Sequence, residues 1–212
     1  MLRIRSTLRL AVASLTAVAV AGLAGCSTDD NNTSGMPGMD HGSSSASAAP
    51  STSASPATGP HNQADVMFAQ MMIPHHQQAI EMSDIILAKD DINPQVIDLA
   101  TQIKAAQGPE IITMSGWLAG WGENSSPSMG MDHDTGGGMM SQADMDALQQ
   151  ATGDEAARLF LTGMIAHHQG AITMAQHEIA NGENPDAQQL AQDIIDAQQA
   201  EITTMKTLLE QL

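Results

Sequence analysis

The sequence predicts an all-α protein, a four-helix bundle built from two repeated helical hairpins. A motif with paired histidines occurs twice, as MMIPHHQQAIEM at 71–82 and as MIAHHQGAITMA at 164–175. A second repeated motif is IKAAQGPEIITM at 103–114 and IIDAQQAEITTM at 194–205; the offset is 92 residues at the histidines and 91 here. Apolar residues recur at helical spacing in all four segments, as expected of helices with one buried face. Repetition of a two-helix unit favours a bundle with a pseudo-twofold axis.

Residues 1–25 are predicted to be a signal peptide. An apolar run at 10–24, too short for a stable membrane span, follows three basic residues, Arg3, Arg5 and Arg9. The run ends in Leu23-Ala24-Gly25-Cys26, which resembles the lipobox of bacterial lipoproteins. We therefore expect cleavage before Cys26, lipidation of that residue and anchoring to the outer face of the cell membrane. The alternative is a secreted protein cut near Ala24 with a free thiol. Because the chain has one cysteine, a disulfide within one chain is excluded.

Two segments have the composition of flexible chain, a tether at 26–61 and a linker at 122–140. Serine, alanine, threonine, proline and glycine dominate the tether, and the cluster in the linker lies among glycines and serines. Such segments bury too little apolar surface to offset the entropy of ordering. Each contains a cluster of thioether and imidazole side chains: Met36, Met39 and His41 in the tether, and Met129, Met131 and His133 in the linker. No core explains these methionines, so the clusters are predicted to capture metal ions as auxiliary sites. Compositional drift is the alternative.

The charge of the chain is strongly negative. Removal of the signal peptide takes away three of the seven basic residues and none of the 24 acidic ones, which leaves a net charge of −20. Such a surface repels nucleic acid and anionic lipid and raises the local concentration of cations. We therefore exclude nucleic acid as a partner, although an acidic surface kept only for solubility is equally consistent with most of these carboxylates.

The first hairpin is predicted at 62–121. On a helical wheel its first helix has one broad apolar sector that also holds two histidines: Phe68, Met72, His75, His76, Ala79 and Met82. Pro74 interrupts this helix, so we expect a kink or a local bulge just before the histidines. Asn93-Pro94 marks the turn. The apolar stripe of the second helix contains Val96, Leu99, Ile103, Glu110 and Met114.

The second hairpin, at 141–212, repeats this arrangement. Its first helix carries Phe160, Met164, His167, His168, Ala171 and Met174 in the matching sector. Asn184-Pro185 marks the turn, and the second helix carries Ile194, Glu201 and Met205 on its stripe. The two glutamates, Glu110 and Glu201, lie near the middle of apolar stripes. A buried carboxylate requires a partner, which here could be a bound cation, a protonated histidine of the facing helix, or another hydrogen-bond donor.

The paired histidines and their neighbouring methionines are the candidate metal site. A thioether and two imidazoles at i, i+3 and i+4 share one side of a helix. These are soft and borderline ligands, which favour Cu(I) and also accept Ag(I), while the glutamates would tolerate Cu(II). The predicted ligands are Met72, His75, His76, Met82, Glu110 and Met114 of the first hairpin, and Met164, His167, His168, Met174, Glu201 and Met205 of the second. The alternative is that the methionines fill the core and the histidines merely hold the glutamates.

The motifs Met72-Ile-Pro-His75-His76 and Met164-Ile-Ala-His167-His168 resemble the hallmark of the bacterial family called domain of unknown function 305. The resemblance covers roughly 62–212. It implies an exported protein with one or two copies of the domain, here two, and a fold similar to ferritin-like helical bundles. It also implies an association with copper, because some members of the family are linked to copper binding and tolerance.

The sequence therefore predicts a lipid-anchored, extracytoplasmic protein that sequesters or buffers copper, or passes it to or from a partner protein. We do not expect an enzyme. The first alternative is a ferritin-like metal-dependent oxidoreductase, but di-iron sites of that class use Glu-x-x-His motifs, and the sequence has none. The second alternative is a metal-free helical interaction module on the cell surface.

Overall fold

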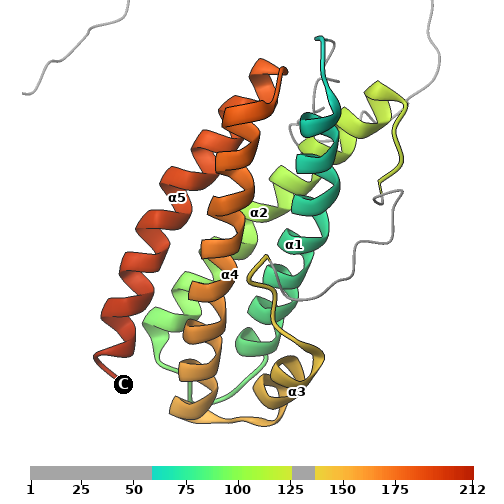
Figure 1. Cartoon of the computed structure of the whole chain (residues 1–212). Coiled ribbons are helices and arrows are strands. Elements are labelled where there is room, and N and C mark those ends of the chain that lie inside the picture. The colour runs from blue at the N-terminus through green and yellow to red at the C-terminus, as the bar shows by residue number, and fades with distance from the viewer. Residues whose placement is uncertain (1–58, 126–136) are drawn as a thin grey trace, which may run out of the picture. The chain divides into compact units, whose positions relative to one another are not determined.

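The computed structural model describes residues 59–125 and 137–212, and the described part forms a helical bundle (Figure 1). It contains four long helices, α1 (Gln63–Leu87), α2 (Pro94–Trp121), α4 (Gly153–Asn181) and α5 (Pro185–Leu209), and a short one, α3 (Gln142–Gln150). The predicted all-α fold is confirmed. The short helix α3 was not predicted. The signal peptide, Cys26 and the two clusters with Met36, Met39 and His41 and with Met129, Met131 and His133 lie outside the described residues.

Three of the four long helices have an asparagine as the N-cap residue. Asn62 caps α1, and its side-chain oxygen accepts from the Ala64 and Asp65 amides at 2.7 and 3.3 Å. Asn93 and Asn184 cap α2 and α5, and a proline occupies the first turn of each of these helices. A proline there loses nothing, because the first amides of a helix have no partner within the helix. The two Asn-Pro dipeptides of the sequence therefore mark where the second helix of each hairpin begins.

Pro74 does not divide α1. The helix is continuous from Gln63 to Leu87 with Pro74 inside it, so of the kink or local bulge expected from the sequence, the bulge is absent. The helix is held on both sides of the proline by buried side chains, Met72 and Ile73 before it and Ala79 and Met82 after it. This packing compensates for the one backbone hydrogen bond that proline removes.

The connection from α2 to α4 determines the topology. Figure 1 shows α1 and α5 running in one direction and α2 and α4 in the other, so the chain must return along the bundle between α2 and α4. One long crossover of this kind is typical of ferritin-like bundles. α1 packs on both α2 and α4, and α4 packs on α5, whereas α2 and α5 touch only slightly. α3 packs against α1 and α4.

The apolar interior consists of two clusters. One contains Phe68, Met72 and Met114 of the first hairpin together with Ala171 and Ile194 of the second. The other contains Phe160, Met164 and Met205 of the second hairpin together with Ala79 and Ile103 of the first. Each long helix passes from one cluster to the other. The residues at the crossing points are polar, and we call them the polar layer: His75, His76, Gln107, Glu110, His167, His168, Gln198 and Glu201.

The start of α1 is bound to the turn between α4 and α5. Asp65 is buried, and its Oδ1 accepts from the amides of Asn184 at 2.8 Å and Glu183 at 3.1 Å. Burial alone would raise the pKa of Asp65, but hydrogen bonds from the Asn62, Asn184 and Glu183 amides lower it. Burial and the neighbouring Asp65 raise the pKa of Glu178 to about 8. The hydrogen bonds that Asp65 accepts from the Glu183 and Asn184 amides therefore join the two hairpins at this end.

No helix among the described residues is both long enough and apolar enough to cross a membrane.

Candidate metal centre

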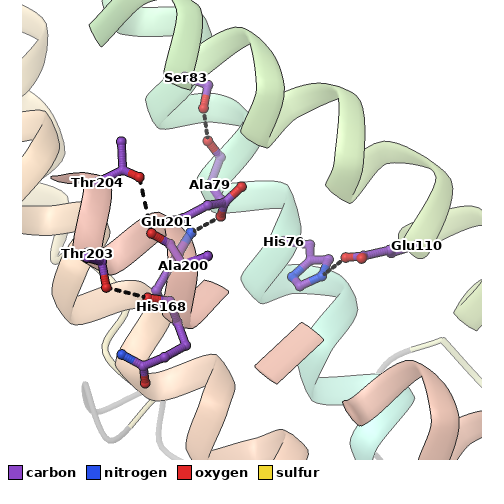
Figure 2. Close-up of polar contacts among 10 residues, drawn as sticks. His76, Ala79, Ser83, Glu110, His168, Ala200, Glu201, Thr203 and Thr204 are labelled. Carbon is purple, nitrogen blue, oxygen red and sulfur yellow. Dashed lines mark hydrogen bonds and ion pairs between the residues drawn. The ribbon is translucent and has the colours of Figure 1, made fainter. Parts of the chain in front are cut away.

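The second histidine of each pair is hydrogen-bonded to the glutamate of its own hairpin. The Nε2 of His76 lies 2.6 Å from Glu110 Oε2, and the Nε2 of His168 lies 2.6 Å from Glu201 Oε2. Figure 2 shows His76 of α1 facing Glu110 of α2. Both histidines are fully buried, and both glutamate side chains are 20% exposed. The sequence left several kinds of partner possible for Glu110 and Glu201. The partner in the structure is the histidine of the facing helix.

The first histidine of each pair faces the other hairpin. The rings of His75 and His167 lie 3.6 Å apart between centroids, with planes inclined at 37°. His75 Nε2 lies 2.7 Å from the carbonyl oxygen of Gly137, which belongs to the segment between α2 and α3. Neither ring nitrogen of His167 has a hydrogen-bond partner. The two hairpins thus meet at a pair of buried imidazoles.

The Nδ1 atom is buried and unpartnered in all four histidines of the polar layer. In His75, His76 and His168 the Nε2 atom faces a carbonyl or carboxylate oxygen, which can only accept, so Nε2 carries the proton. The lone pair of each of these rings is therefore on Nδ1. Histidines that bind metals usually donate their other N–H to a carboxylate or a backbone carbonyl in this manner.

The environment also keeps His75 and His167, which we call the central pair, in the form that binds metals. Burial lowers the pKa of His75 to about 4. The neighbouring His76 and His168 also lower this pKa, and the hydrogen bond to Gly137 opposes them. Burial and the other three histidines hold the pKa of His167 well below its usual range. Both imidazoles are therefore neutral at ordinary pH, and a neutral imidazole has the free lone pair that coordination requires.

Two glutamines add further unsatisfied atoms to the polar layer. Gln107 of α2 and Gln198 of α5 are each 3% exposed. Both side-chain atoms of Gln107 and the Oε1 of Gln198 are buried without a partner. An unsatisfied buried polar group costs about 1–3 kcal/mol, so a layer with this many of them reduces the stability of the folded chain. A bound cation or ordered water would satisfy these groups.

The predicted methionine ligands lie on both sides of the polar layer. Met72 and Met114 belong to one apolar cluster, and Met82, Met164 and Met205 to the other; all five are fully buried. Met174 is only partly buried, at the edge of the first cluster. Met72 and Met164 each precede a histidine of the central pair by one helical turn. Their membership of the site stays a prediction, because core packing explains the same burial.

The described residues contain no group of three or more His, Cys, Asp and Glu side chains arranged to hold a metal ion. Thioethers are the further donors that the sequence places beside the imidazoles. The donor atoms that are free fit a site with both kinds of ligand, because imidazole nitrogens are borderline ligands and methionine sulfurs are the nearest soft ones in sequence. The class of protein that the fold and these atoms define is a helical bundle with a buried, histidine-rich layer suited to a soft cation.

Gly137 is the partner of His75 that the sequence did not reveal. Its contribution is a backbone carbonyl, which has no side-chain signature, and the composition of 122–140 pointed to flexible chain. Residues 137–140 instead pack on α1 and α4. The last four residues of the linker predicted at 122–140 are therefore held in place by these contacts.

The chain belongs to the family described as "Domain of unknown function (DUF305)", whose model matches residues 65–209. The match is a single span, so the division into two copies stays an interpretation of the sequence. A curated relative, an uncharacterized protein of Acanthamoeba polyphaga mimivirus, is 44% identical over 52 residues, which are 24% of this chain. The match spans about a third (34%) of that relative's length.

Solved structures with this fold include two further members of the family. A DUF305 fragment from Deinococcus radiodurans is 31% identical, with a TM-score of 0.67 over 73% of this chain and 100% of the fragment. A Streptomyces coelicolor DUF305 protein that is thought to be secreted is 32% identical, with a TM-score of 0.65 over 70% of this chain and 91% of its own.

A third similar structure is that of CopM in its Cu(II)-bound form. It is 38% identical, with a TM-score of 0.60 over 69% of this chain and 96% of its own. CopM has also been solved with Cu(I) and with Ag bound.

Proposed function

We propose that this protein is an exported copper-binding protein that holds Cu(I) in the polar layer between its two hairpins. The observation that carries the proposal is the set of four buried histidines whose Nδ1 atoms are free while three of the Nε2 atoms are held by oxygen acceptors. This arrangement prepares imidazoles for coordination. The likeness to CopM, which binds Cu(I), Cu(II) and Ag, supports copper as the metal.

Cu(I) is the favoured form because the available donors are soft or borderline. Neutral imidazoles and thioethers suit Cu(I) and Ag(I), and Cu(II) would draw on the carboxylates of Glu110 and Glu201. Those carboxylates are engaged with His76 and His168 in this structure, so we assign them the role of orienting the histidines. Copper is cargo here, and its storage or transfer requires no catalysis.

Location at the outer face of the cell membrane is part of the proposal. The sequence Leu23-Ala24-Gly25-Cys26 supports lipidation at Cys26, and the Streptomyces relative that is thought to be secreted supports export. A protein tethered there would bind copper before it reaches the membrane and could exchange it with a partner protein. The Met and His clusters of the tether and the linker would assist capture.

The alternative of a ferritin-like oxidoreductase finds little support. Di-iron sites of that class use four glutamates and two histidines. Here the polar layer contributes one glutamate from each of α2 and α5, and each is hydrogen-bonded to a histidine. A metal-free interaction module would not require four buried histidines, and so it is tested by the same experiment as the copper proposal.

The test is a competition titration of Cu(I) between a chromophoric chelator and the purified chain under anaerobic conditions. We expect the double variant His75→Ala/His167→Ala to lose the tightest binding, and we expect no change for His177→Ala, an exposed histidine of the same helix α4. Helicity measured by circular dichroism checks that the variants fold. Binding that is micromolar or weaker in the wild type, or unchanged in the double variant, would refute the proposal.

A further inference from the structure

Residues Gly137–Met140, which we call the strap, lie along one side of α4. A Cβ atom added to Gly170 would lie 1.6 Å from the Gly137 carbonyl oxygen, and one added to Gly138 would lie 2.1 Å from the Ala166 carbonyl oxygen. A Cβ atom added to Gly163 would lie 2.6 Å from the sulfur of Met140. Residues 163, 166 and 170 share one stripe of the helix, which includes His167. The strap therefore covers the face of α4 that carries His167.

The strap is also fixed to α1. Its Met140 amide donates to Gln78 Oε1 at 2.8 Å, and Gln78 Nε2 donates to the Met140 carbonyl at 2.9 Å. His75 Nε2 donates to the Gly137 carbonyl at 2.7 Å. These three hydrogen bonds place the strap across the junction of the two hairpins, at the point where His75 and His167 meet.

Three of the four places where the two paired-histidine motifs differ are places that the strap contacts; the fourth is Glu81, where α4 has Thr173. Where α1 has Met71, Pro74 and Gln78, α4 has Gly163, Ala166 and Gly170. Gly163 and Gly170 leave room for the strap on α4, and Gln78 binds it from α1. Met71 stands one turn before His75, but Gly163, one turn before His167, has no side chain. The thioether of Met140 occupies the position that a side chain at 163 would take.

We propose that Met140 is a metal ligand supplied by the strap, which completes a site with His75 and His167. The inference rests on the proposed function, because it adds a donor to the same layer. Its sulfur lies against α4 one turn from His167, a fully buried imidazole with neither nitrogen partnered. Two imidazoles and one thioether form a soft set of three donors, which suits Cu(I).

The Gly137 carbonyl has a second role in this site. By accepting the Nε2 proton of His75 it leaves the Nδ1 lone pair free, so the strap both orients one imidazole and brings the sulfur. Met139, the neighbour of Met140 in the strap, does not pack against the apolar cluster that Met140 contacts. Met139 is therefore the matched control.

The experiment compares Met140→Leu, Met139→Leu and Gly163→Ala with the wild-type chain. Methionine methyl groups labelled with carbon-13 are followed by NMR during addition of one equivalent of Ag(I), and Met140→Leu assigns the Met140 signal. We expect that signal to shift. In Cu(I) competition we expect about tenfold or greater loss of affinity for Met140→Leu, since even partners outside the first coordination sphere contribute that much. Met139→Leu should bind as the wild type does.

Gly163→Ala tests the placement without removing the sulfur. Its new Cβ would displace the Met140 thioether, and alanine is well tolerated in a helix, so affinity should fall while the fold is retained. A Met140 signal that does not move with Ag(I), together with wild-type Cu(I) affinity for Met140→Leu, would overturn the inference and leave the proposed function intact. A wild-type chain that binds neither ion would overturn both.

Discussion

The imidazole rings of His75 and His167 are in contact across the junction of the two hairpins, with centroids 3.6 Å apart. Each comes from a helix that also carries a second histidine, yet the second histidines turn toward glutamates of their own hairpins. The four histidines therefore divide into one central pair and two outer His–Glu pairs. We infer that a site shared by both hairpins lies at the centre.

Replacement of His167 by leucine should stabilise the metal-free protein and abolish its tight copper site. Both ring nitrogens of His167 are buried without partners, and an apolar side chain of similar size removes that penalty. We expect His167→Leu to raise the free energy of unfolding by about 1–3 kcal/mol in urea titrations without metal. The exposed His177→Leu should change it by less than about 0.5 kcal/mol. A destabilised His167→Leu would contradict the absence of hydrogen-bond partners at the His167 ring nitrogens.

Loss of the glutamate partners should weaken copper binding without eliminating it. Glu110→Gln and Glu201→Gln keep the size of the side chain but remove the carboxylate that orients His76 or His168. We expect each to lower Cu(I) affinity by roughly 10- to 100-fold, the usual effect of a group that orients a ligand. Competition titration measures the effect, and Glu81→Gln on the exposed face of α1 is the control. Equal affinities for all three variants would exclude the orienting role.

The stability of the protein should depend on pH through Glu178. Its pKa is raised to about 8 in the folded state by burial and by Asp65, so the folded chain retains a proton that the unfolded chain loses near pH 4.5. The stability associated with this proton is complete below pH 4.5 and is lost as the pH rises through 8. The slope is at most about 1.4 kcal/mol per pH unit.

Glu178→Gln removes that titration. We expect the difference in unfolding free energy between Glu178→Gln and the wild type to grow in favour of the variant from pH 5 to pH 8. Taking the difference cancels the histidines, which titrate in both proteins. A difference that stays constant over this range would contradict the raised pKa.

Alanine at Gly170 should detach the strap. A Cβ there would overlap the Gly137 carbonyl, whereas a Cβ on Gly108, in the middle of α2, would meet nothing within 4 Å. We expect Gly108→Ala to leave hydrogen exchange of the Met140 amide unchanged, because a side chain at this position touches no part of the strap. Gly170→Ala should instead speed hydrogen exchange of the Met140 amide, which is bonded to Gln78. Slow exchange in both variants would show that the strap can shift without detaching.

Much of this fold could be predicted from local sequence. Helical periodicity and the Asn-Pro dipeptides define the four long helices, because caps and apolar stripes act over a few residues. The position of Glu110 in an apolar stripe correctly indicated that it needs a partner, and the histidine of the facing helix was among those considered.

The arrangement of the four histidines could not be predicted in this way. Whether His75 or His76 faces the other hairpin depends on the packing of α1 against α4, which no local pattern specifies. The Gly137 contact uses a backbone carbonyl, and Asp65 binds amides more than a hundred residues away. Long-range contacts of this kind depend on tertiary packing, so they leave little trace in residue types.

The most direct test is a crystal structure of the protein loaded with Cu(I) under anaerobic conditions, with copper located from its anomalous scattering. The account predicts a copper peak in the polar layer, at about 2 Å from the Nδ1 atoms of His75 and His167. Copper found only outside the layer, or bound through Nε2 atoms with the Gly137 and glutamate contacts broken, would contradict it.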